Sequence, residues 1–188
     1  FHETTGAVFT LNCFNTCGDL PDYEIGKLPD RFAGELSACA GWLRFAFHAE
    51  NDRSNYGDGS PGRSLMGQVL GDCAEELEHS YERFRSAVLK FAGSEKAVDR
   101  VTRLGFFAGT EENLKTLRDC PLGILGLLTA DDSRLSYDLT AQENEEVWRR
   151  GFLRDPRRGL VFARTERRLE WVSDIEKELE GLAARRQD

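Results

Sequence analysis

The sequence has little of what usually identifies a protein class. Its 188 residues include only 3 histidines, 5 cysteines and 5 prolines. An odd and sparse set of cysteines favours reduced thiols in a cytoplasmic protein over a disulfide framework. No Cys or His pair at zinc-site spacing complements Cys13 and Cys17, so the spacing does not predict a structural zinc site. The five cysteines are Cys13, Cys17, Cys39, Cys73 and Cys120.

Long apolar runs and several diagnostic motifs are missing as well. No apolar run approaches the roughly 20 residues of a membrane-spanning helix, so the sequence predicts no membrane partner. There is no phosphate-binding loop ending in Lys and Ser or Thr, and no G-x-G-x-x-G directly follows a predicted strand, so nothing supports nucleotide binding. The G-x-S-x-G turn of serine hydrolases is also absent.

The charge balance argues against nucleic acid as a partner. Asp and Glu number 33 against 25 Lys and Arg, which gives a net charge of -8. A negative surface repels phosphate backbones. Charged residues (31%) and hydrophobic residues (40%) are in the ordinary globular range, and the length suits one domain over residues 1–188.

Apolar segments alternate with helical patterns along the chain. The strongest helix, Asp72 to Ala92, carries an apolar stripe and is followed by Gly93 as a stop signal. Other helices are predicted from Pro29 to Gly41, from Thr110 to Pro121 and from Ser173 to Arg185. The predicted strands are Ala7 to Phe14, Trp42 to Phe47, Arg100 to Ala108 and Gly123 to Leu128, with further short strands at Leu135 to Leu139 and Leu160 to Arg164.

This alternation is typical of parallel strands joined by crossover helices. A barrel and an open doubly wound sheet both satisfy it, and in both the ligands bind at the carboxyl ends of the strands. The longest predicted loop, Asn51 to Gly67, directly follows such an end. We therefore expect one rim to contain the segments Asn12 to Asn15, His48 to Asp52, Gly105 to Thr110 and Thr129 to Asp132.

His48 is the residue at this rim with the most chemical potential. It follows a predicted strand, and Glu50 and Asp52 come directly after it. An imidazole with nearby carboxylates can hold a divalent metal or act in general acid and base catalysis. Alternatively, His48 caps the strand by hydrogen bonding to a loop. Asp131, beside Asp132 in a predicted turn, is a further candidate catalytic carboxylate, although adjacent carboxylates in a turn more often face water.

Several segments resemble a branch of the polysaccharide deacetylase (NodB-homology) superfamily. They are GAVFTLNCF at Gly6 to Phe14, the helix with Phe32 and Glu35, GWLRFAFHAENDRSNY at Gly41 to Tyr56, and VLKFAG at Val88 to Gly93. The FHA tripeptide at Phe47 to Ala49 is the most distinctive of these. The similarity runs in order over roughly Phe1 to Asp138.

The resemblance implies a distorted (β/α) barrel of about seven strands, whose first strand would precede Phe1. It also implies a divalent metal, zinc or similar, held by one aspartate and two histidines. The metal would activate a water that attacks an acetyl group. Only His48 matches one of these ligands, and Gly105 stands where related sequences are expected to have a histidine.

Two functions follow as hypotheses. The first is a metal-dependent deacetylase acting on a polysaccharide or amino sugar, with His48 as metal ligand and Glu50, Asp52 and Asp131 as candidate catalytic residues. The second is a non-catalytic carbohydrate-binding or scaffold domain. In either case the candidate substrate-binding residues are Asn12, Tyr56 and Phe106, because aromatic faces can stack on sugar rings. A glycoside hydrolase, a third possibility, would need two carboxyl groups across a cleft.

Overall fold

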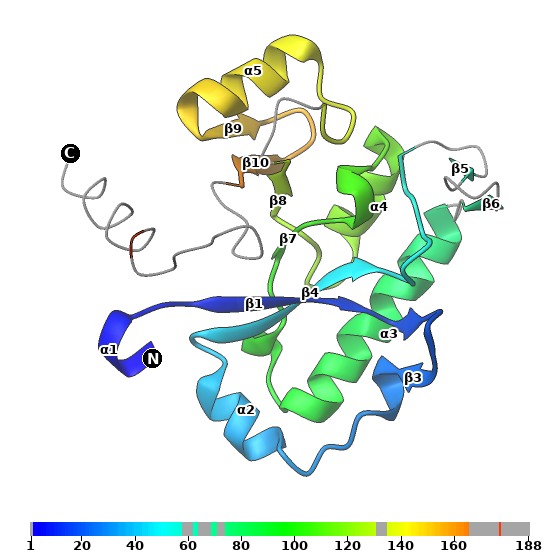
Figure 1. The fold of residues 1–188 in the computed structure, drawn as a ribbon, viewed down its shortest axis with the longest axis vertical. Helices are drawn as coiled ribbons and strands as arrows, with labels where there is room; N and C mark the ends of the chain where they lie inside the picture. Colours follow the sequence, from blue (N-terminus) through cyan, green and yellow to red (C-terminus); the bar gives the residue numbers. More distant parts are fainter. Residues whose placement is uncertain are drawn as a thin grey trace.

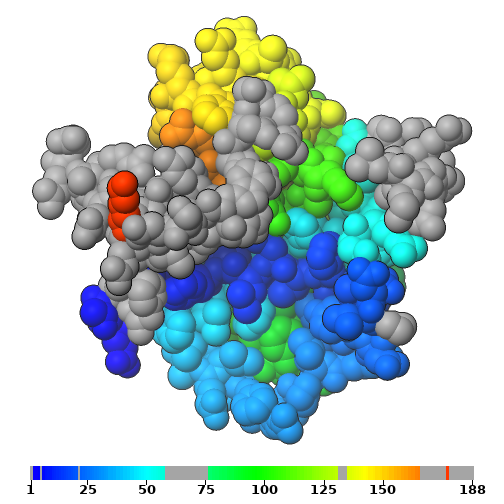
Figure 2. Space-filling model, in the orientation of Figure 1, coloured from blue at the N-terminus to red at the C-terminus, as the bar shows by residue number. Residues whose placement is uncertain are grey.

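The described part of the chain is a mixed α/β structure built around short parallel and antiparallel strands (Figure 1). The computed structural model describes residues 2–57, 62–63, 69–70, 74–130, 135–165 and 177. In Figure 1, α5, β9 and β10 lie at one end of the molecule and α2 at the other, with β1 and β4 between them. Figure 2 shows β1, in blue, at the surface of this face.

The strands form two main sheets. β1 pairs in parallel with β4, and a second sheet has the order β7-β8-β10-β9, in which only β9 is antiparallel to its neighbour. A parallel bridge between Phe45 and Val98 connects the two sheets. The strands are β1 (Phe9–Phe14), β4 (Leu43–Ala49), β7 (Val101–Thr102), β8 (Gly126–Thr129), β9 (Phe152–Asp155) and β10 (Leu160–Arg164).

The predicted barrel of about seven strands is wrong. The sheets of the described residues have two or four strands, and none of them is closed. The parallel order stops at β10 because residues 156–159 connect β9 to β10 directly, and so short a connection permits only antiparallel pairing. β9 therefore occupies the outer edge of β10, where a further parallel strand would have to pair.

Two predicted strands are shorter than expected or absent. The segment Arg100 to Ala108 forms only the two residues of β7 before a 3₁₀ turn, η3 (Gly105–Phe107), takes the chain out of the sheet. Leu135 to Leu139 is irregular rather than a strand. It precedes a helix that the apolar pattern did not predict, α5 (Ala141–Arg150).

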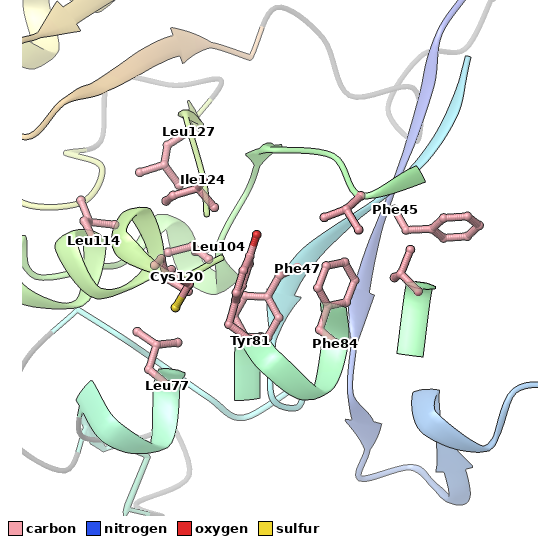
Figure 3. Packing of buried hydrophobic residues seen from close by; sticks show 14 of the residues in the cluster. Phe45, Phe47, Leu77, Tyr81, Phe84, Leu104, Leu114, Cys120, Ile124 and Leu127 are labelled. Atoms are coloured by element: carbon pink, nitrogen blue, oxygen red, sulfur yellow. The ribbon is translucent and has the colours of Figure 1, made fainter. Parts of the chain in front are cut away.

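The long predicted helix is confirmed as α3 (Ala74–Ala92), and its apolar stripe forms much of the core. The Phe47 ring of β4 packs edge-on against Tyr81 at 5.6 Å and lies 5.7 Å from the Phe84 ring (Figure 3). Phe45 packs edge-on against Phe91 at 5.0 Å. Alternate residues of β4 therefore face α3, and the residues between them face the other side of the sheet.

The remaining elements are short. The predicted helices after Pro29 and Thr110 are confirmed as α2 and α4, while the predicted helix Ser173 to Arg185 and part of the predicted loop Asn51 to Gly67 lie outside the described residues. Within the described ranges, no helix combines the length and apolar character needed to cross a membrane. The other elements are α1 (His2–Thr5), β2 (Thr16–Cys17), β3 (Leu20–Glu24), η1 (Ile25–Lys27), α2 (Ala33–Cys39), β5 (Gly62–Arg63), β6 (Val69–Leu70), η2 (Glu95–Ala97) and α4 (Glu111–Asp119).

Candidate functional site

His48 lies near the carboxyl end of β4, on the side of the sheet opposite α3, since its neighbour Phe47 packs on that helix. The side chain is nearly buried, with 9% of its surface exposed. Its Nδ1 bonds to the backbone carbonyl of Arg103, directly after β7, and the Phe14 ring of β1 packs edge-on against it at 4.8 Å. Three neighbouring strand ends thus hold the imidazole.

The environment of His48 favours the neutral imidazole. Burial lowers the pKa of His48 below its ordinary value of 6.5, and the nearby Arg103 charge lowers it further, while the hydrogen bond to the Arg103 carbonyl acts in the opposite direction. Because a carbonyl oxygen can only accept, Nδ1 carries the proton and Nε2 has the lone pair. Nε2 has no hydrogen-bond partner among the described residues and lies toward Gly105, where an added Cβ would be 4.0 Å away.

Asn12 and Arg103 lie beside this imidazole. The Asn12 side-chain oxygen accepts hydrogen bonds from the Thr102 hydroxyl (3.3 Å) and the Arg103 backbone N–H (3.4 Å). These bonds leave the Asn12 amide group, a donor, on an exposed side chain. The Arg103 guanidinium lies over the Phe107 ring, 5.6 Å from its centroid.

The turn after β7 holds an exposed aromatic ring in a strained backbone. Phe106 and Phe107 both have left-handed backbone φ values, 57° and 54°, which residues other than glycine rarely adopt. Tyr137, with φ 55°, donates its backbone N–H to the Phe107 carbonyl at 2.6 Å. Phe106 itself is 59% exposed. Strain of this kind persists where the surrounding structure enforces it, and it is concentrated at functional sites.

The carboxylates that follow His48 in the sequence do not join it. The Glu50 carboxylate pairs with Arg83 of α3 at 3.0 Å and accepts from the Asn15 amide at 2.7 Å, which places it on the α3 side of the sheet. Asp52 accepts the backbone N–H of Gly18 at 3.0 Å. The predicted convergence of an imidazole with these two carboxylates is therefore not found.

Two further candidates are also removed from the described site. Tyr56 is completely buried, with its ring 6.3 Å from the Phe47 ring, and its hydroxyl accepts the Glu50 backbone N–H. Its ring has no surface on which a sugar could stack. Asp131 lies outside the described residues. Of the predicted site residues, His48 and Asn12 both bond to the Arg103 backbone, and Phe106 follows Arg103 in the next turn of the chain.

Arg103, which belongs to the site, and Tyr137, which bonds to the turn that follows β7, were not predicted. Both fall in segments that were expected to be strand, where alternation would not single them out. Tyr137 bonds to Phe107, 30 positions earlier, and no local signal in the sequence indicates a contact over that distance.

The described residues do not fit the metal that the family resemblance implies. Within the described ranges, no three His, Cys, Asp or Glu side chains are arranged to hold a metal ion. His48 offers one nitrogen, whereas a zinc site in a protein has three or four protein ligands. No reaction step through a metal is therefore derived for these residues.

Comparisons with known proteins provide no relative. No family model matches the chain, and neither a curated protein nor a solved structure matches it. We define the rim site as Asn12, His48, Arg103, Phe106 and the backbone of Gly105.

Proposed function

We propose that this chain is a carbohydrate-binding domain whose ligand lies on the rim site. The observation that carries the proposal is the exposed Phe106 ring, in a turn with two successive left-handed residues whose Gly105 lies next to the His48 imidazole. A sugar presents an apolar face, which an aromatic ring can stack against, and hydroxyl groups, which both donate and accept hydrogen bonds.

The polar groups of the rim site complement such a ligand. His48 Nε2 can accept a hydrogen bond from a hydroxyl, while the exposed Asn12 amide can donate one to a hydroxyl or ring oxygen. The His48 ring is fixed by the Arg103 carbonyl, and Asn12 by Thr102 and the Arg103 N–H. Groups fixed in advance lose little conformational entropy when a ligand binds.

Calorimetric titration with tetrasaccharides of glucose, xylose, N-acetylglucosamine and galacturonic acid tests this proposal. We expect at least one of them to bind, and Phe106→Ala to weaken that binding about tenfold, which corresponds to roughly 1.4 kcal/mol. Phe32→Ala is the matched control, because Phe32 is also an exposed ring but precedes α2. No binding to any of the four, or equal losses in the two variants, would contradict the proposal.

A metal-dependent carbohydrate deacetylase is the second candidate. The state of His48 favours it, because metal-bound histidines characteristically donate their other ring N–H to a carbonyl or carboxylate. Titration of zinc into the protein, followed by acetate release from chitotetraose, tests it. Absence of zinc binding, or an affinity unchanged in His48→Ala, would remove this candidate.

We also propose a reducing compartment, the cytoplasm, as the place where the protein acts. The support is that Cys13, Cys17, Cys39 and Cys120 are free thiols. Burial raises the pKa of Cys13 and of Cys120 to about 11, so both are protonated at neutral pH and react slowly. Fractionation of cells that express the natural gene, probed with an antibody, would test the location.

A further inference from the structure

Arg103 is the charged group of the rim site, and its backbone is fixed on both sides. Its N–H donates to Asn12 and its carbonyl accepts from His48. The Arg103 side chain therefore extends from a fixed point of the backbone. Its guanidinium lies over the ring of Phe107, the last residue of the turn that contains Phe106. A cation over an aromatic face is held in place while its N–H groups stay available as donors.

The charge of Arg103 is not balanced by the described carboxylates. Among the residues that the structure describes, no ion pair involves Arg103, whereas Arg83, Arg118 and Arg158 each pair with a carboxylate. Glu50, which was expected at this rim, pairs with Arg83 instead. In a protein of net charge -8, the one charged side chain among the described residues of the rim site is therefore positive.

We infer that the rim site selects an acidic saccharide, in which a uronic acid carboxylate pairs with Arg103 while the sugar ring stacks on Phe106. This inference rests on the proposed function and names the class of ligand. A guanidinium presents its N–H groups as a planar fork that matches a carboxylate. The neutral His48 imidazole and the Asn12 amide would bind hydroxyl groups of the same sugar, so each polar group of the site has a complementary partner on the ligand.

A pair of matched ligands tests the inference: tetragalacturonic acid and its fully methyl-esterified form. The two have the same ring and linkages but differ in charge. We expect the acid to bind at least tenfold more tightly than the ester in low salt. The difference should shrink as ionic strength rises, because added salt screens the charge of Arg103.

Variants assign the preference to Arg103. Arg103→Gln should abolish the preference for the acid, so that acid and ester bind with similar affinity, while Arg103→Lys should keep part of the preference. Arg154→Gln, on β9, is the matched control and should behave as the wild type. The melting temperature shows whether Arg103→Gln has kept the fold.

Two results would overturn the inference in different ways. Equal binding of acid and ester, or a preference that persists in Arg103→Gln, overturns the assignment of the ligand class but leaves carbohydrate binding intact. Binding of neither ligand, together with no binding of the neutral tetrasaccharides, overturns the proposed function and the inference with it.

Discussion

His48 is a buried side chain whose ionisation is coupled to folding. Desolvation disfavours the imidazolium, and the neighbouring Arg103 charge adds to this effect, so the pKa in the folded protein is below 6.5. The neutral ring fits closely between Phe14 and the Arg103 carbonyl. A proton on Nε2 would introduce a poorly solvated charge there, so protonation opposes folding.

The stability of the protein should therefore fall on acidification in a way that depends on His48. The unfolded chain binds a proton at His48 more readily than the folded one, so this contribution is fully present above pH 6.5 and is lost as the pH falls through the lowered folded pKa. Urea unfolding of wild type and His48→Gln between pH 7.5 and pH 5 measures it. The variant should show a shallower decline, and parallel curves for the two proteins would refute the prediction.

Phe106 has a strained backbone and an exposed ring. Substitutions can therefore change its effect on stability and its effect on binding separately. A left-handed conformation costs a residue other than glycine about 1–2 kcal/mol. Glycine avoids that cost but loses more entropy on folding, about 0.5–1 kcal/mol.

Phe106→Gly should consequently leave the free energy of unfolding unchanged or raise it by up to about 1.5 kcal/mol, while it weakens sugar binding about tenfold. Phe106→Ala should weaken binding to a similar extent but should retain the strain. Thermal unfolding and calorimetric titration of both variants check the two effects. A clear loss of stability in Phe106→Gly would show that the ring packs against the fold and is not held for a ligand.

Helix α5 is stabilised mainly at its two ends. Thr140 accepts the Glu143 N–H at 3.2 Å, and the Glu143 carboxylate accepts the Thr140 N–H at 2.8 Å, so the pair forms a capping box. At the other end, Gly151 adopts a left-handed conformation with φ 80°. The capping residues define this helix more clearly than its apolar residues do, since Asn144 and Val147 are its only fully buried ones.

Removal of the cap should therefore weaken α5 measurably. Thr140→Ala is expected to cost about 1 kcal/mol of unfolding free energy, whereas Thr140→Ser, which keeps the hydroxyl and caps a helix at least as well, should leave it nearly unchanged. Urea unfolding measures the difference. If both variants lost the same amount, the methyl group of Thr140 rather than its hydroxyl would be the stabilising feature.

At the level of the complete fold, a buried ion-pair network holds α5 to the turn between β9 and β10. Arg158 and Asp155 have side chains only 6% and 3% exposed, and they pair directly. Arg158 also lies 3.4 Å from the Glu143 carboxylate and donates to the Asp138 carbonyl at 2.9 Å. The network therefore fixes the outer edge of the four-stranded sheet against the helix that covers it.

Breaking this network should destabilise the whole protein, because a buried charge would lose its partner. We expect Asp155→Asn to cost about 3–5 kcal/mol. The matched control is Glu146→Gln, which breaks the exposed Arg150–Glu146 pair (2.7 Å) and should cost under about 1 kcal/mol. Similar small losses in the two variants would show that solvent reaches the Asp155 carboxylate.

A feature of the fold or of the site could be predicted when residues close together in the sequence determine it. Apolar periodicity predicted α3 and the strand with His48, because a stripe or a run of apolar residues is a local property. Helix α5 carried a local signal too, its capping box, but its weak apolar pattern concealed it. The rim location of His48, Asn12 and Phe106 followed from the direction of parallel strands.

The amino-acid order alone was sufficient to place His48 at the end of a strand and to favour an α/β fold. The described ranges contain no helix that could span a membrane. Only the packed chain turned Glu50 toward Arg83, buried Tyr56, placed the Arg103 backbone between His48 and Asn12, and left the sheets of the described residues open. The physical reason is that side-chain partners and strand pairing join residues tens of positions apart. The sequence around each residue does not specify those contacts.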